Sequence, residues 1–280
     1  MKAFLLNLDR RVVFLCVFLG AAVPLLIPFH FPIKATIQVR AVYDTIETIA
    51  DRGGGTVLIS FDYGPSSLPE LQPMALSILR QCFDRKLKVV VMNLWPQGVG
   101  LAQQALNIVS RERNAVYGEN YVFLGYKTGM TSLVINMGQD FHNAFPQDLQ
   151  GNSTADQAIT RGISSLRDFD YVISLAAGNT PDQVWIPFGQ EKYKFPFGIG
   201  CTAVMAPDMY PFLQSGQMNG LIGGLAGAAE YEVLVKTPGS ATEGMKPQSI
   251  VHLVIIFFIA LGNLMYFLYG RSQQVQGGVR

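Results

Sequence analysis

The sequence predicts a mostly parallel α/β sheet flanked by helices, a Rossmann-like three-layer domain inserted between two transmembrane α-helices. Only 15% of the 280 residues are charged, against about one quarter in an ordinary soluble domain. Two long runs near the chain ends, 12–31 and 250–270, contain no Asp, Glu, Lys or Arg. Between them, short apolar runs alternate with longer mixed segments, which is the rhythm of βαβ units.

Each apolar run is long enough to cross a bilayer, which takes about 20 helical residues. The first run is longer than the core of a cleaved signal peptide, about 7 to 15 residues, and prolines stand where a small-residue cleavage pattern belongs. We therefore expect an uncleaved anchor. The second run ends in Tyr266, Tyr269 and Arg271, which favour the headgroup zone. Asn263 within it offers an amide to a neighbouring helix or to the interface.

The distribution of Lys and Arg predicts the side of the membrane on which each part of the chain lies. Two spans place the tails, 1–11 and 271–280, on one side of the membrane and residues 36–235 on the other. The tails carry Lys2, Arg10, Arg11, Arg271 and Arg280, whereas the domain-side flanks carry Lys34, Arg40, Lys236 and Lys246. The positive-inside rule then puts both tails in the cytoplasm by a margin of one residue. We expect a cell (inner) membrane protein with an extracytoplasmic domain.

The middle region divides into expected strands and helices. The expected strands are 56–61, 89–94, 121–126, 132–136, 171–175 and 199–205. The expected helices are 37–49, 68–85, 101–113, 155–166, 181–188 and 208–235. Ser67 and Thr180 each begin a capping-box pattern. The segment 236–249, rich in Pro, Gly, Ser and Thr, reads as a linker to the second span.

A candidate ligand-binding mouth lies at the ends of these strands, because ligands of open parallel sheets bind beyond the carboxyl ends. Its residues lie at or just beyond the ends of the strands 56–61, 89–94 and 171–175, and they are Asp62, Tyr63, Ser66, Asn93, Trp95 and Asn179. The alternative is that they are ordinary turn and cap residues.

Catalytic and metal signatures are incomplete. His142 is the only histidine outside the spans and their flanks, and it would have to activate Ser66, Ser67 or Cys201 without a nucleophile-elbow pattern. The histidine and cysteine spacings match no zinc site, and the aspartate spacings match no calcium loop. No metal, cofactor or catalytic residue is predicted. The net charge of +1 gives no support for a nucleic-acid partner.

Cys82 and Cys201 stand in apolar contexts and read as buried thiols. Their spacing alone does not show whether they are paired in a disulfide.

Five glycines repeat at intervals of three and four within the expected helix 208–235, and they are Gly216, Gly220, Gly223, Gly224 and Gly227. On a helix this spacing makes a smooth face that another backbone can approach closely. Each glycine lowers helix stability by up to about 1 kcal/mol relative to alanine, so close packing has to compensate. The packing partner lies either inside the domain or on another subunit.

These observations lead first to a noncatalytic structural or scaffolding subunit of an oligomeric membrane assembly. Its partners would be the lipid bilayer and other membrane protein chains, with the five glycines at the interface. The second hypothesis is a membrane-anchored ligand-binding or sensor domain that uses the mouth around Asp62. A membrane-anchored serine-type hydrolase is the third.

Overall fold

The computed structural model describes residues 9–27 and 32–270, and the chain divides into two units. One unit comprises Met1–Pro32 with Glu243–Arg280, and the other is the α/β domain, Ile33–Thr242. The predictions made for most of the N-terminal tail, for residues 28–31 of the first span and for the tail 271–280 concern residues outside the described part.

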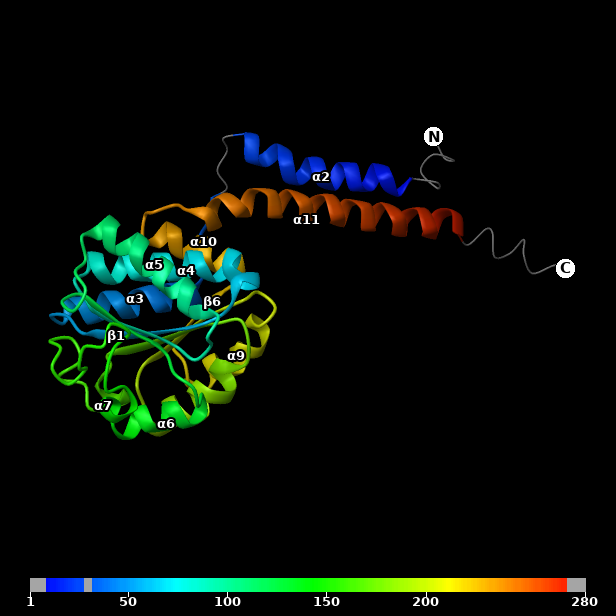
Figure 1. The fold of residues 1–280 in the computed structure, drawn as a ribbon. Coiled ribbons are helices and arrows are strands. Elements are labelled where there is room, and N and C mark those ends of the chain that lie inside the picture. The colour runs from blue at the N-terminus through cyan, green and yellow to red at the C-terminus, as the bar shows by residue number, and fades with distance from the viewer. Residues whose placement is uncertain (1–8, 28–31, 271–280) are drawn as a thin grey trace. The chain divides into compact units, whose positions relative to one another are not determined.

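Six strands form one all-parallel sheet at the centre of the α/β domain (Figure 1). They are β1 (Thr56–Asp62), β2 (Lys88–Asn93), β3 (Tyr121–Tyr126), β4 (Tyr171–Ala176), β5 (Phe197–Cys201) and β6 (Gly220–Gly223). Their order in the sheet is β3-β2-β1-β4-β5-β6, the doubly wound order with its switch point between β1 and β4. The prediction of a parallel sheet flanked by helices is confirmed.

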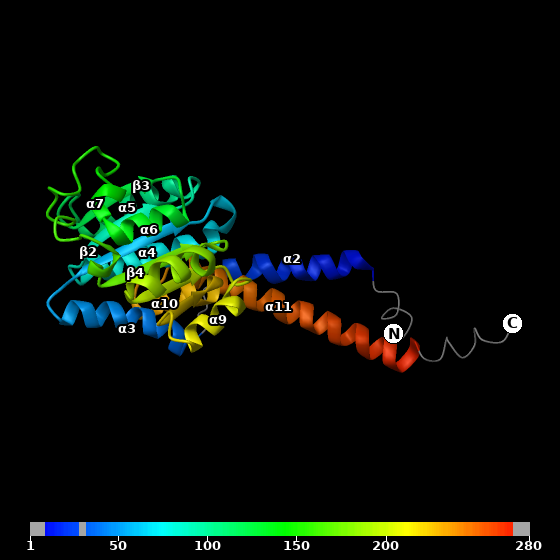
Figure 2. The ribbon, with the colours of Figure 1, turned by 90° about the horizontal axis from the view of Figure 1, so that it is seen from below.

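Helices cover both faces of this sheet (Figures 1 and 2). One layer contains α3 (Ile37–Asp51), α4 (Leu68–Asp84), α5 (Gly98–Arg113) and α10 (Gly224–Leu234). The other contains α6 (Thr131–Gln139), α7 (Phe141–Ala144), the π-helix η3 (Pro181–Gln190), α8 (Glu191–Tyr193) and α9 (Ala206–Gln214). The 3-10 turns η1 (Pro65–Ser67) and η2 (Leu166–Asp168) precede α4 and β4. Because both faces are covered, every residue of β1 and β4 is buried.

Two predicted elements in the β3–β4 connection are wrong. Residues 132–136 are part of the helix α6, whose buried residues Leu133, Val134 and Met137 follow helical spacing. Residues 155–165 form turns and irregular structure instead of a helix, and Leu166 begins the 3-10 turn η2. The reason is local competition for hydrogen bonds: the Thr160 hydroxyl donates to the carbonyl of Thr154, and the Gln157 amide donates to the carboxylate of Asp148.

The predicted helix 208–235 is also wrong. The structure has α9, then β6, then α10. Because β6 is the last strand of the sheet, the strand expected at 199–205 does not close it. That strand is β5, and it ends at Cys201. Gly216 and Gly224 have φ of +76° and +61°, a left-handed conformation that interrupts a helix. A Cβ at Gly220 would lie 2.5 Å from Cγ2 of Val42, so this glycine lets α3 approach β6 closely.

Neither expected capping box forms, and the linker is shorter than predicted. The side chains of Ser67 and Thr180 make no cap hydrogen bond, while Glu70 instead accepts from the Ala203 backbone N–H at 2.8 Å. The helix α11 (Ser240–Met265) begins inside the expected linker and continues as the π-turn η4 (Tyr266–Gly270). Residues 235–239 alone therefore connect α10 to α11.

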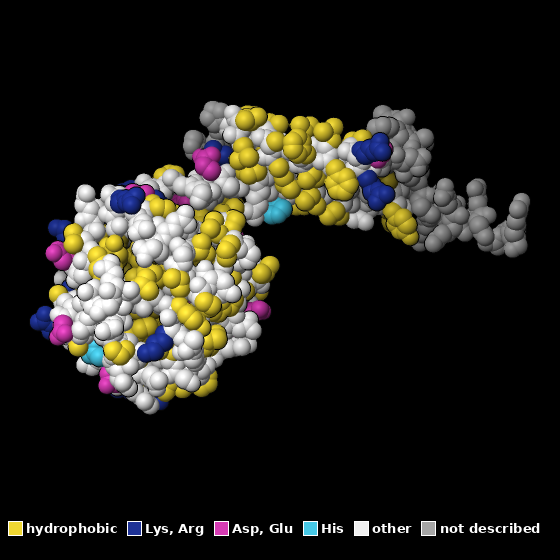
Figure 3. Space-filling view, in the orientation of Figure 1, with side chains coloured by type: hydrophobic (Ala, Val, Ile, Leu, Met, Phe, Trp, Pro, Cys, Tyr) yellow, Lys and Arg dark blue, Asp and Glu magenta, His cyan; other side chains and the backbone are white. Residues whose placement is uncertain are grey.

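In the other unit, α2 (Arg10–Leu26) and α11 lie side by side (Figures 1 and 2). A Cβ at Gly20 would lie 3.5 Å from Val254 and 3.6 Å from Ile250, so glycine permits close helix contact. Large apolar side chains are exposed along both helices (Figure 3). Among the described residues, one helix is long and apolar enough to span a membrane by length and composition, Ser240–Leu268. The described part of α2 has 17 residues.

Candidate functional site

The switch point of the sheet is the position at which a doubly wound fold binds ligands. We define the switch-point site as the carboxyl ends of β2, β1 and β4 with the segments that follow them, 62–67, 93–98 and 177–182. Asp62 is the last residue of β1, Asn93 is the last residue of β2, and Asn179 follows β4. All six residues of the predicted mouth belong to these three segments.

Asp62 is fully buried and has no cationic partner among its hydrogen bonds. Its carboxylate accepts from the Ser60 hydroxyl at 2.9 Å and from the Leu94 backbone N–H at 2.8 Å. Ser174 Oγ and Trp185 Nε1 lie farther away, each at 3.5 Å. Burial raises the pKa of Asp62 from 3.8 to about 6, although these donors partly oppose the shift.

Tyr63 and Asn93 are also buried, but their side chains lie toward α4 and α5, on the opposite face of the sheet from the Asp62 carboxylate. The Tyr63 hydroxyl donates to Gln72 of α4 at 2.6 Å, and burial raises the pKa of Tyr63 above its ordinary value. The Asn93 amide donates to the Phe61 carbonyl at 2.8 Å, but its Oδ1 makes no hydrogen bond among the described residues. Gly98 completes this arrangement, since a Cβ there would overlap the Phe61 carbonyl oxygen.

The other three predicted residues lie nearer the surface. Ser66 and Asn179 are exposed, and Trp95 is half-buried. The Trp95 indole presses on the backbone of Gly178, where a Cβ would lie 2.7 Å from two of its ring atoms. Trp95 therefore covers Ala177 and Gly178, which connect β4 to Asn179.

Four residues were missed in the sequence: Thr180 within the site, and the hydrogen-bond partners of Asp62, which are Ser60, Ser174 and Trp185. Ser60 and Ser174 are the polar residues within the otherwise apolar stretches of β1 and β4, and a hydroxyl in a buried strand is a signal that could have identified them. Thr180 is 1% exposed, and its hydroxyl makes no hydrogen bond among the described residues. It precedes the π-helix η3, an element often associated with functional sites.

The residues considered for hydrolysis have other surroundings. Nδ1 of His142 lies 3.1 Å from the Thr154 hydroxyl, and the hydrogen bonds described for His142 include neither Ser66 nor Cys201. Cys82 and Cys201 are free, buried thiols. Burial raises the pKa of each to about 12, so both are protonated at neutral pH. In the described ranges, no three His, Cys, Asp or Glu side chains gather as metal ligands would.

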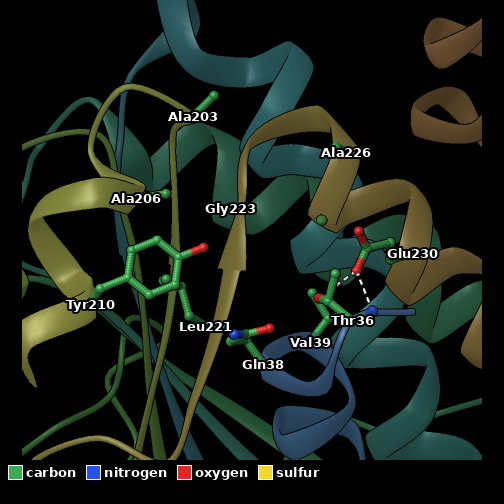
Figure 4. A pocket seen from close by; sticks show the side chains of 11 residues that line it. Thr36, Gln38, Val39, Ala203, Ala206, Tyr210, Leu221, Gly223, Ala226 and Glu230 are labelled. Atoms are coloured by element: carbon green, nitrogen blue, oxygen red, sulfur yellow. Dashed lines mark hydrogen bonds between the residues drawn. The ribbon is translucent and has the colours of Figure 1, made fainter. Parts of the chain in front are cut away.

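A hollow lies at the carboxyl end of β6 (Figure 4) and has a volume of about 180 Å³. Small residues and the Tyr210 ring line it, together with Glu230. The Glu230 carboxylate accepts from the backbone N–H and the hydroxyl of Thr36, at 2.8 and 2.7 Å.

The five glycines of the predicted interface do not share one helix face. Gly216 lies in a turn, Gly220 and Gly223 belong to β6, and Gly224 and Gly227 open α10. Gly223 and Gly227 line the hollow of Figure 4. A role for these glycines in contact with another subunit stays a prediction, although the helical face on which it was based is absent.

The topology and the polar groups at its switch point define the class of this protein: a doubly wound α/β domain joined to apolar helices. Comparison with protein-family models, with curated proteins and with solved structures found no match to the chain.

Proposed function

We propose that this protein is a membrane-anchored ligand-binding domain whose site is the switch point. The observation that carries the proposal is a buried carboxylate without a cation, together with unsatisfied buried polar atoms, in the segments at the strand ends where this fold class binds ligands. Asp62 is buried without a cation, and both Asn93 Oδ1 and Thr180 Oγ1 lack hydrogen bonds among the described residues. Native interiors contain few such groups, and each one calls for an explanation. A ligand that donates hydrogen bonds at the carboxyl ends of β1 and β4 would give atoms of this kind a partner.

The anchoring part of the proposal is that α2 and α11 both cross the bilayer. Its support is the charge-free apolar sequence of 12–31 and 250–270 together with the helix contact at Gly20. The distribution of Lys and Arg in the flanks supports an extracytoplasmic domain. Under this proposal, only the α/β domain meets water-soluble ligands.

The test is equilibrium dialysis of the full chain in nonionic detergent against a defined mixture of small cations, anions and neutral polar molecules. We expect the protein to retain at least one compound, identified by mass spectrometry. Thr180→Val should abolish retention while leaving stability unchanged within about 0.5 kcal/mol, because it removes a hydroxyl that has no partner. Thr128→Val, at an exposed threonine, is the matched control. Retention of nothing, or equal retention by Thr180→Val, would count against the site.

A scaffolding role is the second proposal. It is favoured by Ile37 and Val204, which are 84% and 85% exposed and are chain neighbours of residues lining the hollow of Figure 4. Exposed apolar side chains that gather on a surface mark protein contacts. In mild detergent we expect a protein mass above the 30.7 kDa of one chain, and Val204→Asp should reduce it. A monomeric wild-type protein at high concentration would exclude this role.

A further inference from the structure

The switch-point site is rich in hydrogen-bond acceptors and lacks positive charge. The groups that approach the Asp62 carboxylate are hydroxyls, a backbone N–H and an indole N–H, all of them neutral. Neither Asp62 nor Asp182 belongs to any ion pair of the described residues. A buried carboxylate without a cation is unfavourable, so the site is electrostatically prepared for a positive group.

The unsatisfied atoms point to the same chemistry. Asn93 Oδ1 accepts hydrogen bonds and cannot donate them, and the Thr180 hydroxyl can accept as well as donate. Thr180 and Asp62 follow or end the neighbouring strands β4 and β1, whereas the Asn93 side chain lies on the α5 side of the sheet. An ammonium group carries N–H donors and no acceptor, which matches the acceptors Asp62 and Thr180.

Aromatic groups border the acceptors. The sequence contains two tryptophans, and both are here: Trp185 Nε1 lies 3.5 Å from the Asp62 carboxylate, and Trp95 covers Gly178. Indole faces attract cations and also pack against alkyl groups. Trp95 is half-buried in a segment whose next two residues, Pro96 and Gln97, are exposed, so it is the side chain that must move to admit a ligand.

We propose that the switch-point site binds an organic ammonium group, held by Asp62 and Thr180, with the organic part of the ligand under Trp95. This proposal rests on the proposed ligand-binding function and adds the chemical class of the ligand. It makes Trp95 a lid, closed in this structure.

Tryptophan fluorescence tests the proposal directly, because both tryptophans border the site. The full chain in nonionic detergent is titrated with n-butylammonium chloride, sodium butyrate or 1-butanol, which share an alkyl chain and differ in the head group. We expect a saturable fluorescence change with butylammonium, and binding of butyrate weaker by about tenfold or more. Asp62→Asn should weaken butylammonium binding by a similar factor. Asp156→Asn, which removes an exposed carboxylate, should leave it unchanged.

The outcomes separate the two proposals. Saturable binding of butyrate or butanol that is lost in Thr180→Val would overturn the ammonium assignment while leaving a ligand site at the switch point. Butylammonium binding that persists at full strength in Asp62→Asn would also overturn it. If none of the three probes gives a saturable change, the ammonium proposal fails, and the dialysis experiment then decides the proposed function by itself.

Discussion

Replacing Glu232 with glutamine is expected to destabilise the domain by about 3 kcal/mol, because a buried carboxylate that accepts four hydrogen bonds loses its charge and half of its accepting capacity. Glu232 lies on α10 and is 1% exposed. One of its oxygens accepts from the backbone N–H of Gly239 and from both the N–H and the hydroxyl of Thr242, at 2.6 to 2.8 Å. The other accepts from the Ala241 N–H at 3.1 Å.

Glutamine has nearly the same size and shape as glutamate, so this substitution tests the hydrogen bonds of the side chain without changing its packing. In Glu232→Gln the new NH₂ group must face either one or three of these donors, so at least one buried donor loses its acceptor. The carboxylate also caps the first turn of α11, where negative charge is favourable. We expect unfolding to occur about 6 to 12 °C lower. Backbone amides of residues 239–242 should lose hydrogen-exchange protection before the rest of the domain does.

Glu119→Gln is the matched control, because Glu119 is exposed and surface substitutions usually change stability by less than about 0.5 kcal/mol. Equal melting temperatures for Glu232→Gln and wild type, with unchanged exchange at 239–242, would show that this carboxylate does not hold the start of α11.

Glu232 also explains why the start of α11 was not predicted from the sequence. The composition of 236–249 predicts a linker, although Ser240 and Glu243 have the spacing of a capping box. The start depends on a carboxylate eight residues earlier that folds back onto the first turn. Such tertiary capping overrides local propensity, and the same holds for Glu70, whose carboxylate bonds Ala203 instead of completing a capping box.

Most strands of the sheet could be predicted, because a strand that is buried on both faces is a nearly continuous apolar run in the sequence. The apolar runs that became β1, β2, β3 and β4 were each predicted to within one residue at either end. β6 was missed because its four residues, Gly-Leu-Ile-Gly, carry too short an apolar run to separate from a helix. Gly220 is explained by the contact with Val42 of α3, a neighbour about 180 positions away that no local pattern contains.

Part of the candidate site could be predicted from the sequence for a related reason. Parallel strands expose their carboxyl ends at one edge, so Asp62 and Asn93 could be found from strand ends alone. Thr180 belongs to the site, and Trp185 approaches Asp62, because β4 lies next to β1 in the sheet. That adjacency follows from strand order, which the sequence pattern does not specify.

Asp62→Asn is expected to stabilise the domain by about 3 kcal/mol at neutral pH and to have little effect below pH 4. In the folded protein the pKa of Asp62 is raised from 3.8 to about 6, so the folded state binds more protons than the unfolded state between these values. Stability from this group therefore falls as pH rises through that window and stays lower above it. A shift of about two pH units corresponds to about 3 kcal/mol. Asparagine keeps an acceptor for Leu94 and Ser60 without the buried charge.

The measurement is the difference in free energy of unfolding between wild type and Asp62→Asn from pH 4 to pH 8. This difference cancels the titration of other groups, such as Asp148, whose hydrogen bonds lower its pKa against the effect of burial. Asp156→Asn should give a difference that does not change with pH. A flat profile for Asp62→Asn would mean that the buried carboxylate is not destabilising.

A stabilised Asp62→Asn variant that no longer binds butylammonium would connect the two properties of this residue. Binding residues are often retained at a cost in stability, because the arrangement that favours a ligand is unfavourable without it. The hydrogen bonds from Ser60 and Leu94 would serve an amide as well as a carboxylate, so they give no reason for a buried charge. An ammonium ligand gives such a reason, since it supplies the cation that Asp62 lacks and should raise stability as its concentration rises above the dissociation constant.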